Sequence, residues 1–294
     1  NIWQARAAMC ELLALSFRYP EDKVLAEAIA SGEWGEAADE IAGVLGLDWT
    51  VATAPGAAEA AALPDPDDIQ KELRPEATRL FVGAPEAACS PYEGVWRAKA
   101  EGVQPLLFVN PHSMEVERFM RACGLGRPEG TNEPLDHVAT ECELMEHLAL
   151  RAAGAEPPEG APAGSGLPGG SPAAAYGAFL EEHARAWMPR FADAVAAESR
   201  VPFYRDAAAF LGALGTKIEA VATAEPRRRR QQPGCGAMAR RPAPQPYRQL
   251  LLLLHRGPEA GERPGVVEGE AYPLLQPLAA GGQPERMPPE CASL

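Results

Sequence analysis

The stretch EPLDHVATECELMEHLALRAA, residues 133–153, decides the fold of this chain. From residue 138 onward its apolar side chains recur every three or four positions, which is the spacing of one buried helix face. This stripe consists of Val138, Cys142, Met145, Leu148, Ala149 and Ala152. The pattern predicts a helix over residues 136–153 that packs its stripe against a core.

Helical spacing also appears on both sides of this stretch, and runs rich in valine and isoleucine, typical of strands, are nearly absent. We therefore predict an all-α fold with almost no sheet. The expected helices span residues 2–17, 22–31, 34–45, 68–82, 112–123, 173–197 and 202–221. Residues 83–111 are rich in proline and glycine and predict a long loop, which the aromatic Tyr92 and Trp96 indicate to be ordered.

These helices predict one compact multi-helix domain over residues 1–224, with internal linkers at about 51–67 and 154–172. Residues 225–294 differ, since they hold 12 of the chain's 30 prolines and contain no Lys, Asp, Asn, Ile, Phe or Trp. Such a composition buries too little apolar surface to offset the entropy of ordering, so we predict a disordered tail. An alternative hypothesis is a shifted reading frame of a GC-rich gene, because residues with AT-rich codons cease at Lys217 and Ile218.

The formal net charge of −14 is unevenly distributed. Residues 1–224 hold 17 basic and 34 acidic side chains, a charge of −17, whereas residues 225–294 hold 10 and 7, a charge of +3. A body this acidic is repelled by nucleic acid and by anionic membranes, and it attracts basic peptides. An acidic surface that only keeps the protein soluble is the alternative interpretation.

Localisation follows from the apolar segments. Residues 1–17 are interrupted by Arg6 and Glu11, so they lack the continuous apolar core of an export signal. No run approaches the ~20 apolar residues that span a bilayer. We expect a cytoplasmic protein without stable membrane insertion.

Catalytic and metal-binding motifs are absent from the sequence. The six cysteines form no CxxC pair and are expected to be reduced thiols, mostly buried. No serine lies in a nucleophile elbow, and no glycine-rich loop has the lysine of a phosphate site. His137 and His147 point roughly 80° apart around a helix, on different turns, so they do not form a metal site. We predict no catalytic residues, no metal and no cofactor.

Residues 133–137, EPLDH, lead directly into the central helix and have a structural interpretation. Pro134 suits a first helical turn, and Glu133 and Asp136 put negative charge where the helix dipole favours it. His137 and Glu141 are four residues apart, so a mutual contact that ties the loop to the helix is expected.

The ordered set of motifs resembles the TorD/DmsD (NarJ-related) family of redox-enzyme maturation chaperones. The motifs are ELLA at residues 11–14, TRLFVG at 78–83, SPYEGVW at 90–96, FMRACGL at 119–125 and EPLDH at 133–137, with Glu141, Leu144 and Met145 behind the last. The match covers roughly residues 2–222, and the E-P-x-D-H pattern is the hallmark of the family.

The resemblance implies the all-helical fold of this family and a role as a cytoplasmic chaperone. Such proteins bind the twin-arginine signal peptide, and often the apo form, of a DMSO-reductase-type catalytic subunit, and hold back export until the molybdopterin cofactor is inserted. The cofactor therefore belongs to the client, and the chaperone is expected as a monomer or homodimer. Two alternatives stay open: a NarJ-like assembly factor for a non-exported reductase subunit, and a nucleotide-hydrolysing enzyme.

A twin-arginine peptide presents two guanidinium groups beside an apolar segment, so its receptor needs carboxylates near an apolar groove. We expect such a peptide-binding site at Glu133, Pro134, Asp136, His137, Tyr92, Trp96 and Glu141. The charge of Asp136 is expected to receive an arginine, with His137 orienting the loop through Glu141. For Tyr92 and Trp96, pinning the long loop to the core is an equally good interpretation.

Overall fold

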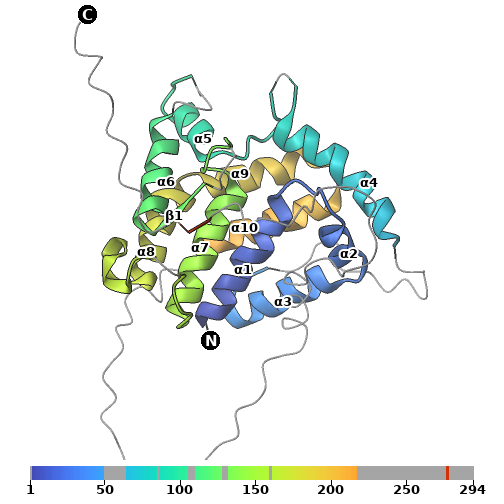
Figure 1. Cartoon of the computed structure of the whole chain (residues 1–294). Helices are drawn as coiled ribbons and strands as arrows, with labels where there is room; N and C mark the ends of the chain where they lie inside the picture. The colour runs from blue at the N-terminus through green and yellow to red at the C-terminus, as the bar shows by residue number, and fades with distance from the viewer. Residues whose placement is uncertain are drawn as a thin grey trace, which may run out of the picture.

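Two long helices, α1 (Ile2–Phe17) and α7 (Val138–Ala152), lie side by side at the centre of the molecule (Figure 1). The computed structural model describes residues 2–49, 64–84, 86–104, 110–127, 132–158, 161–216 and 276–277. Within these ranges the chain is mostly helical and its regular secondary structure is almost all helix, which confirms the predicted all-α class. The central helix predicted from residues 133–153 is therefore the axis of the fold.

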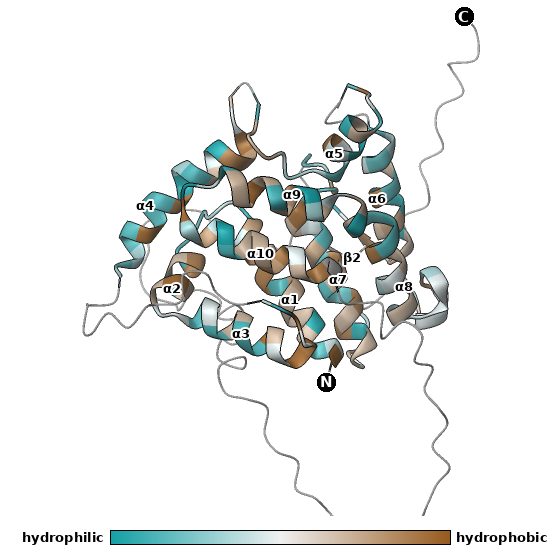
Figure 2. Cartoon of the chain, turned by 180° about the vertical axis from the view of Figure 1, so that it is seen from behind, coloured by the Kyte–Doolittle hydropathy of each residue, from teal (hydrophilic) through white to brown (hydrophobic). Residues whose placement is uncertain are grey.

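The remaining helices surround this central pair. Helices α2 and α3 pack beside α1 and α4, α8 packs against α7, and α10 packs against α9 and touches α1 (Figure 2). Their bounds are α2 (Val24–Ala30), α3 (Glu33–Leu45), α4 (Pro66–Ala77), α5 (Glu93–Ala100), α6 (Pro111–Ala122), α8 (Pro172–Phe179), α9 (Arg185–Glu198) and α10 (Pro202–Thr216). Two π-helical turns, η1 (Thr78–Val82) and η4 (Leu180–Ala184), continue α4 and join α8 to α9.

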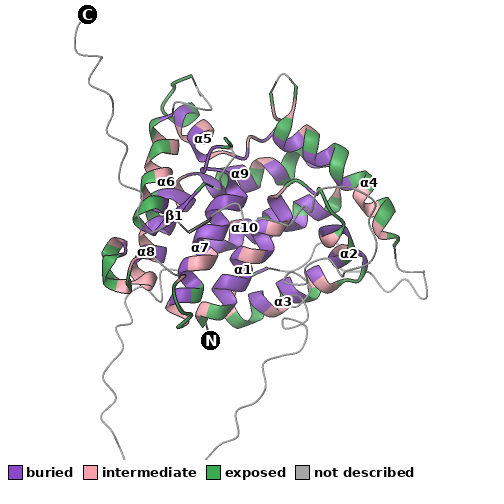
Figure 3. Ribbon diagram, in the orientation of Figure 1, coloured by how far each residue is buried: buried purple, intermediate pink, exposed green. Residues whose placement is uncertain are grey.

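The core follows the apolar stripe of the central helix. Most side chains of α7 are buried, whereas the outer helices α3 and α4 expose one face (Figure 3). An aromatic cluster closes the core beside α3, where the ring of Trp34 meets those of Trp49, Phe203 and Phe210 edge-on. The indole nitrogen of Trp34 donates a hydrogen bond of 2.9 Å to Ser16 Oγ, so this buried polar group is paired.

The helix α5 was missed by the sequence prediction, which placed a loop over residues 83–111. Pro91 and Gly94 are among the residues that predicted a loop. Gly94 in fact lies inside the first turn of α5, where the neighbouring residues leave no room for a side chain. A Cβ atom on Gly94 would lie 2.5 Å from Ser113 Oγ and 2.9 Å from Asn110 Cγ, on the neighbouring helix α6. The glycine therefore permits close packing and does not break the helix.

The segment predicted as a linker, residues 154–172, joins α7 to α8. It contains two short 3-10 helices, η2 (Gly164–Gly166) and η3 (Pro168–Gly170), and Leu167 is buried in the core. Arg151 of α7 donates a hydrogen bond of 2.8 Å to the Pro162 carbonyl. Residues 51–63 of the other predicted linker lie outside the described residues.

Most of the predicted tail also lies outside the described residues, as does the predicted domain end at residue 224. Only β2 (Gln276–Pro277) is placed, and it pairs antiparallel with β1 (Leu125–Gly126). This two-stranded pair is the whole sheet content of the described part of the chain, in agreement with the prediction of almost no sheet.

Removal of residues 225–294 is expected to lower the free energy of unfolding by less than ~1 kcal/mol. The described core draws its side chains from residues up to Leu214, so truncation leaves that core intact. Urea denaturation of the truncated and full-length proteins measures the difference. A larger loss would show that the tail stabilises the helical body.

Candidate functional site

The EPLDH segment is joined by its backbone to the start of α5. Tyr92 and His137 form an isolated antiparallel bridge. The Val138 amide donates to the Pro91 carbonyl at 2.8 Å, and the Glu93 amide donates to the Asp136 carbonyl at 2.9 Å. Two motifs about forty residues apart in the sequence thus form one site.

Asp136 links three helices from a buried position. Its Oδ2 atom accepts hydrogen bonds from the Gly94 amide at 2.8 Å and from Ser113 Oγ at 2.6 Å. The side chain is only 1% exposed, and burial raises the pKa of its carboxyl above the ordinary value. Asp136 therefore caps α5 from outside that helix and holds α6 beside it. The carboxylate is directed at the Gly94 amide and Ser113 Oγ and not at the surface, and the expectation that it receives a peptide arginine stays a prediction.

His137 is the N-cap of α7, and its Nδ1 atom accepts a hydrogen bond of 3.1 Å from the Ala139 amide. Its ring meets the ring of Tyr92 edge-on, with centroids 5.3 Å apart. Burial, together with the charge of Arg18, lowers the pKa of His137 to about 4. The imidazole is therefore neutral near pH 7, as its role as a hydrogen-bond acceptor requires.

Glu141 does not make the expected side-chain contact with His137. Its carboxyl group is fully buried and accepts a hydrogen bond of 3.1 Å from Trp187 Nε1. Burial and the negative charge of Glu93 raise the pKa of Glu141 well above the ordinary value. The predicted contact was wrong because His137 turns back to cap its own helix.

Pro134 is buried, and Trp96 has contacts that hold its loop. Pro134 is buried ahead of α7 and not in its first turn, since that helix begins at Val138. Trp96 is half-buried, its Nε1 donates a hydrogen bond of 2.7 Å to the Ser90 carbonyl, and its ring meets Phe191 edge-on. For Trp96 the structure shows the loop-pinning contacts that the sequence analysis offered as one alternative.

Glu133 and Tyr92 form the accessible part of the predicted set. Glu133 is exposed and Tyr92 is half-buried. The Tyr92 hydroxyl donates a hydrogen bond of 3.1 Å to Glu133 Oε1. We name these two residues the binding edge, because together they offer a carboxylate and an aromatic ring to a ligand at the surface.

Several residues that build this site were missed by the sequence analysis: Glu93, Gly94, Asn110, Ser113 and His183. Asn110 caps α6 through the His112 amide, at 3.0 Å, and also donates to the Gly94 carbonyl at 2.7 Å. The Asn-Pro pair at residues 110–111 is a recognisable helix start, so this cap had a signal in the sequence. The contacts of Ser113 and His183 had none, since they depend on helices that meet only in the fold.

Metal-ligand clusters and membrane-spanning helices are two features that the described ranges lack. Within those ranges no group of three or more His, Cys, Asp and Glu residues is arranged to hold a metal ion. None of the helices described there is long and apolar enough to cross a membrane. The described cysteines, Cys10, Cys89, Cys123 and Cys142, are buried free thiols, as predicted.

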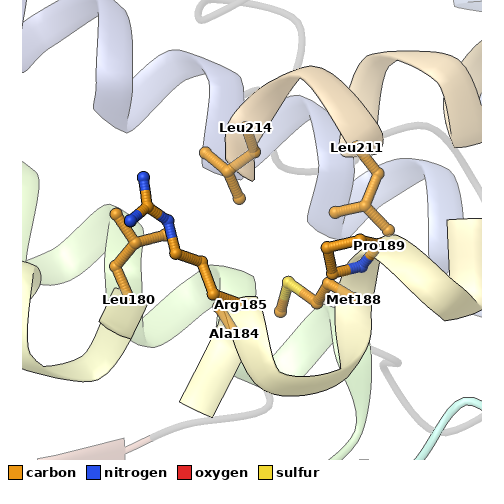
Figure 4. A pocket seen from close by; sticks show the side chains of 7 residues that line it. All are labelled: Leu180, Ala184, Arg185, Met188, Pro189, Leu211 and Leu214. Carbon is orange, nitrogen blue, oxygen red and sulfur yellow. The ribbon is translucent and has the colours of Figure 1, made fainter. Parts of the chain in front are cut away.

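A shallow apolar pocket lies away from the motif, between η4, α9 and α10 (Figure 4). Its empty volume is about 200 Å³. The lining residues are Leu180, Ala184, Arg185, Met188, Pro189, Leu211 and Leu214. None of the predicted site residues contributes to it.

Comparison with known proteins places this arrangement in a family. Residues 33–193 match the family described as nitrate reductase delta subunit. The chain belongs to this family. The motifs of the sequence had indicated a resemblance to TorD/DmsD and NarJ-related proteins. The family match and the relatives described next confirm this resemblance.

Curated relatives of this delta-subunit-family chain are named "Chaperone protein TorD". The protein from Vibrio cholerae serotype O1 (strain El Tor Inaba N16961) is 29% identical over 126 residues, which are 43% of this chain and 51% of that protein. The protein from Photobacterium profundum is 29% identical over 86 residues, 29% of this chain and 38% of that protein. The chain thus spans about half, or less, of the length of these relatives.

Proposed function

We propose that this protein is a cytoplasmic chaperone for a DMSO-reductase-type molybdoenzyme. It binds the twin-arginine signal peptide and the apo form of the catalytic subunit, assists cofactor insertion and holds back export. The family match and the relatives named TorD support a chaperone rather than an enzyme. The molybdopterin cofactor belongs to the client, and the chaperone acts as a monomer or homodimer without binding nucleic acid or inserting into a membrane.

The observation that carries this proposal is the binding edge. Glu133 offers an exposed carboxylate to a guanidinium group, and the half-buried ring of Tyr92 lies beside it. The charge of −17 on residues 1–224 attracts a basic peptide from a distance. Pro134, Asp136, His137, Glu141 and Trp96 act in binding by holding this edge in place.

Replacing Glu133 with glutamine is expected to weaken binding of a synthetic twin-arginine signal peptide about fivefold at low salt. The amide oxygen still accepts from Tyr92, so the change removes charge and keeps geometry. The loss should shrink as salt rises, because exposed charges are screened within about 10 Å at 0.1 M salt. Isothermal titration calorimetry at two salt concentrations measures both effects.

Glu181→Gln is the matched control, since Glu181 is an exposed glutamate on η4 outside the binding edge. It should leave peptide affinity unchanged. Equal affinity of Glu133→Gln and the parent at low salt would remove Glu133 from the site. No binding of the peptide by the parent, together with turnover of nucleotide, would favour the enzyme alternative.

The NarJ-like alternative concerns the client and not the site. A pull-down with the full chain, followed by sequencing of the client's amino terminus, separates the two. A client with a twin-arginine signal supports export proofreading. A client without one supports an assembly factor for a reductase that stays in the cytoplasm.

A further inference from the structure

A buried charged cluster lies directly beneath the binding edge. Glu93, the first residue of α5, has no exposed surface, yet its carboxylate contacts two basic side chains. Its Oε1 atom accepts a hydrogen bond of 2.7 Å from Arg97 Nη1, and His183 Nδ1 lies 3.1 Å from each carboxylate oxygen. His183 Nδ1 can donate to these oxygens when it carries the ring proton.

This cluster joins elements that are distant in the sequence. His183 belongs to the π-helical turn η4, and its ring stacks on Phe179 at 4.8 Å. Asp136 and Glu141 face Glu93 from the EPLDH segment and from α7. Short π-helical segments are frequent at functional sites. Here the turn buries His183 while the two preceding glutamates stay exposed.

The energetics argue against a purely stabilising role. Burying a carboxylate costs several kcal/mol, and a buried ion pair is often no more stabilising than apolar residues of similar volume. What such a cluster does provide is a fixed direction for each member, because every hydrogen bond constrains an angle. Fixing the direction of the Glu93 side chain also restricts the backbone of its neighbour Tyr92.

We propose that Glu93 and His183 are positioning residues for the binding edge. The backbone of Tyr92 is extended, with φ −115° and ψ 128°, so the side chains of Tyr92 and Glu93 leave the chain in different directions. While Glu93 is held inside by His183 and Arg97, the Tyr92 hydroxyl meets Glu133. This inference rests on the proposed function for its consequence, but the geometry can be tested without a peptide.

Substitution of Glu93 by glutamine tests the inference. Glutamine keeps the size of the side chain and removes the charge that both partners bind. We expect the ring signal of Tyr92, observed by NMR after selective ¹³C-tyrosine labelling and assigned with Tyr92→Phe, to shift in the free protein. Affinity for the twin-arginine peptide should fall about threefold. Glu76→Gln is the control, since Glu76 is also buried and paired with Arg79, but lies outside this cluster.

His183 provides a second test, which holds if Glu93→Gln fails to fold. In His183→Asn the side-chain amide nitrogen lies close to the position of the histidine Nδ1 atom, so it can still donate to Glu93. In His183→Gln the amide nitrogen lies close to the position of Nε2, so this hydrogen bond is lost. Both substitutions lose the same stacking on Phe179. His183→Asn should therefore keep the parental Tyr92 signal, and His183→Gln should shift it.

The outcomes separate the inference from the proposed function. An unchanged Tyr92 signal in Glu93→Gln, or equal signals in the two His183 variants, would overturn the positioning role. Absence of peptide binding by the parent, with the signal shifted in Glu93→Gln, would overturn the proposed function alone.

Discussion

Replacing Asp136 with alanine is expected to lower the free energy of unfolding by about 3 kcal/mol. The substitution removes the acceptor of two hydrogen bonds, from the Gly94 amide and from Ser113 Oγ. Both donors face a site that is 1% exposed, so water does not readily replace the lost oxygen. Leaving buried donors unpaired costs more than the net value of the bonds themselves. Urea denaturation followed by circular dichroism measures the loss.

Two further variants separate the loss of the acceptor oxygen from the cost of leaving the Ser113 donor unpaired. Asp136→Asn retains an amide oxygen for the same donors, so its loss should be about 1 kcal/mol. Combining Asp136→Ala with Ser113→Ala should cost less than the sum of the two single changes, because the second removes a donor that the first leaves unpaired. A loss below ~1 kcal/mol for Asp136→Ala would mean that the site opens to water and that Asp136 is accessible after all.

This role could not be predicted from the sequence around Asp136. A helix start followed by an apolar stripe was evident, and both features occur in the structure. Acidic residues at such a position usually face solvent near the positive end of their own helix dipole. Asp136 instead caps α5, which lies some forty residues earlier in the sequence. Local patterns carry no information about which distant helix end arrives at a given side chain.

The same reasoning explains which parts of the fold were predictable. Helices with a long, regular stripe, such as α1 and α7, were placed within two residues of their observed ends. The short helix α5 was missed because its single glycine is required by close packing against α6, and packing has no local signature. Proline and glycine predicted a linker at residues 154–172, and this composition carried no sign that Leu167 would be buried in the core.

Glu133 and Tyr92 form the accessible part of the predicted site. Neither belongs to the apolar stripe of a helix, since Glu133 lies ahead of α7 and Tyr92 is the N-cap of α5, but such a position does not by itself give exposure, because Asp136 and His137 also precede α7 and are buried. The buried pair Glu93 and His183 was not found, since a charged residue in the core is recognised only when its neutralising partners are known.

Glu146 on α7 leads to the second large prediction, a gain of stability at alkaline pH when it is replaced. Burial, with the charges of Glu11 and Glu143, raises the pKa of Glu146 to about 9 from the ordinary 4.5. The folded protein therefore keeps a proton that the unfolded chain releases above pH ~4.5. The contribution of Glu146 to the free energy of unfolding is therefore fully present below pH ~4.5 and is lost as pH rises toward 9.

Replacing Glu146 with glutamine removes this titration and keeps the shape of the side chain. The free energy of unfolding at pH 8 should rise by about 2 kcal/mol, less than the full pKa shift would give because the side chain keeps some contact with water. At pH 4.5 the variant and the parent should be almost equally stable. Glu72 is an exposed glutamate on α4, and Glu72→Gln is the control. It should have the same difference in free energy of unfolding between pH 4.5 and pH 8 as the parent.

Two histidines, the buried His137 and the half-buried His147, contribute to the acid side of the same stability profile. Burial lowers the pKa values of His137 and His147 to about 4, so the unfolded chain takes up their protons first as pH falls below the ordinary 6.5. Their contribution is present above pH 6.5 and is lost toward pH 4. Because Glu146→Gln leaves these histidines in place, it should shift the pH of maximum stability upward. A stability profile with its maximum unmoved by Glu146→Gln would show that the Glu146 carboxyl is already ionised in the folded protein at neutral pH.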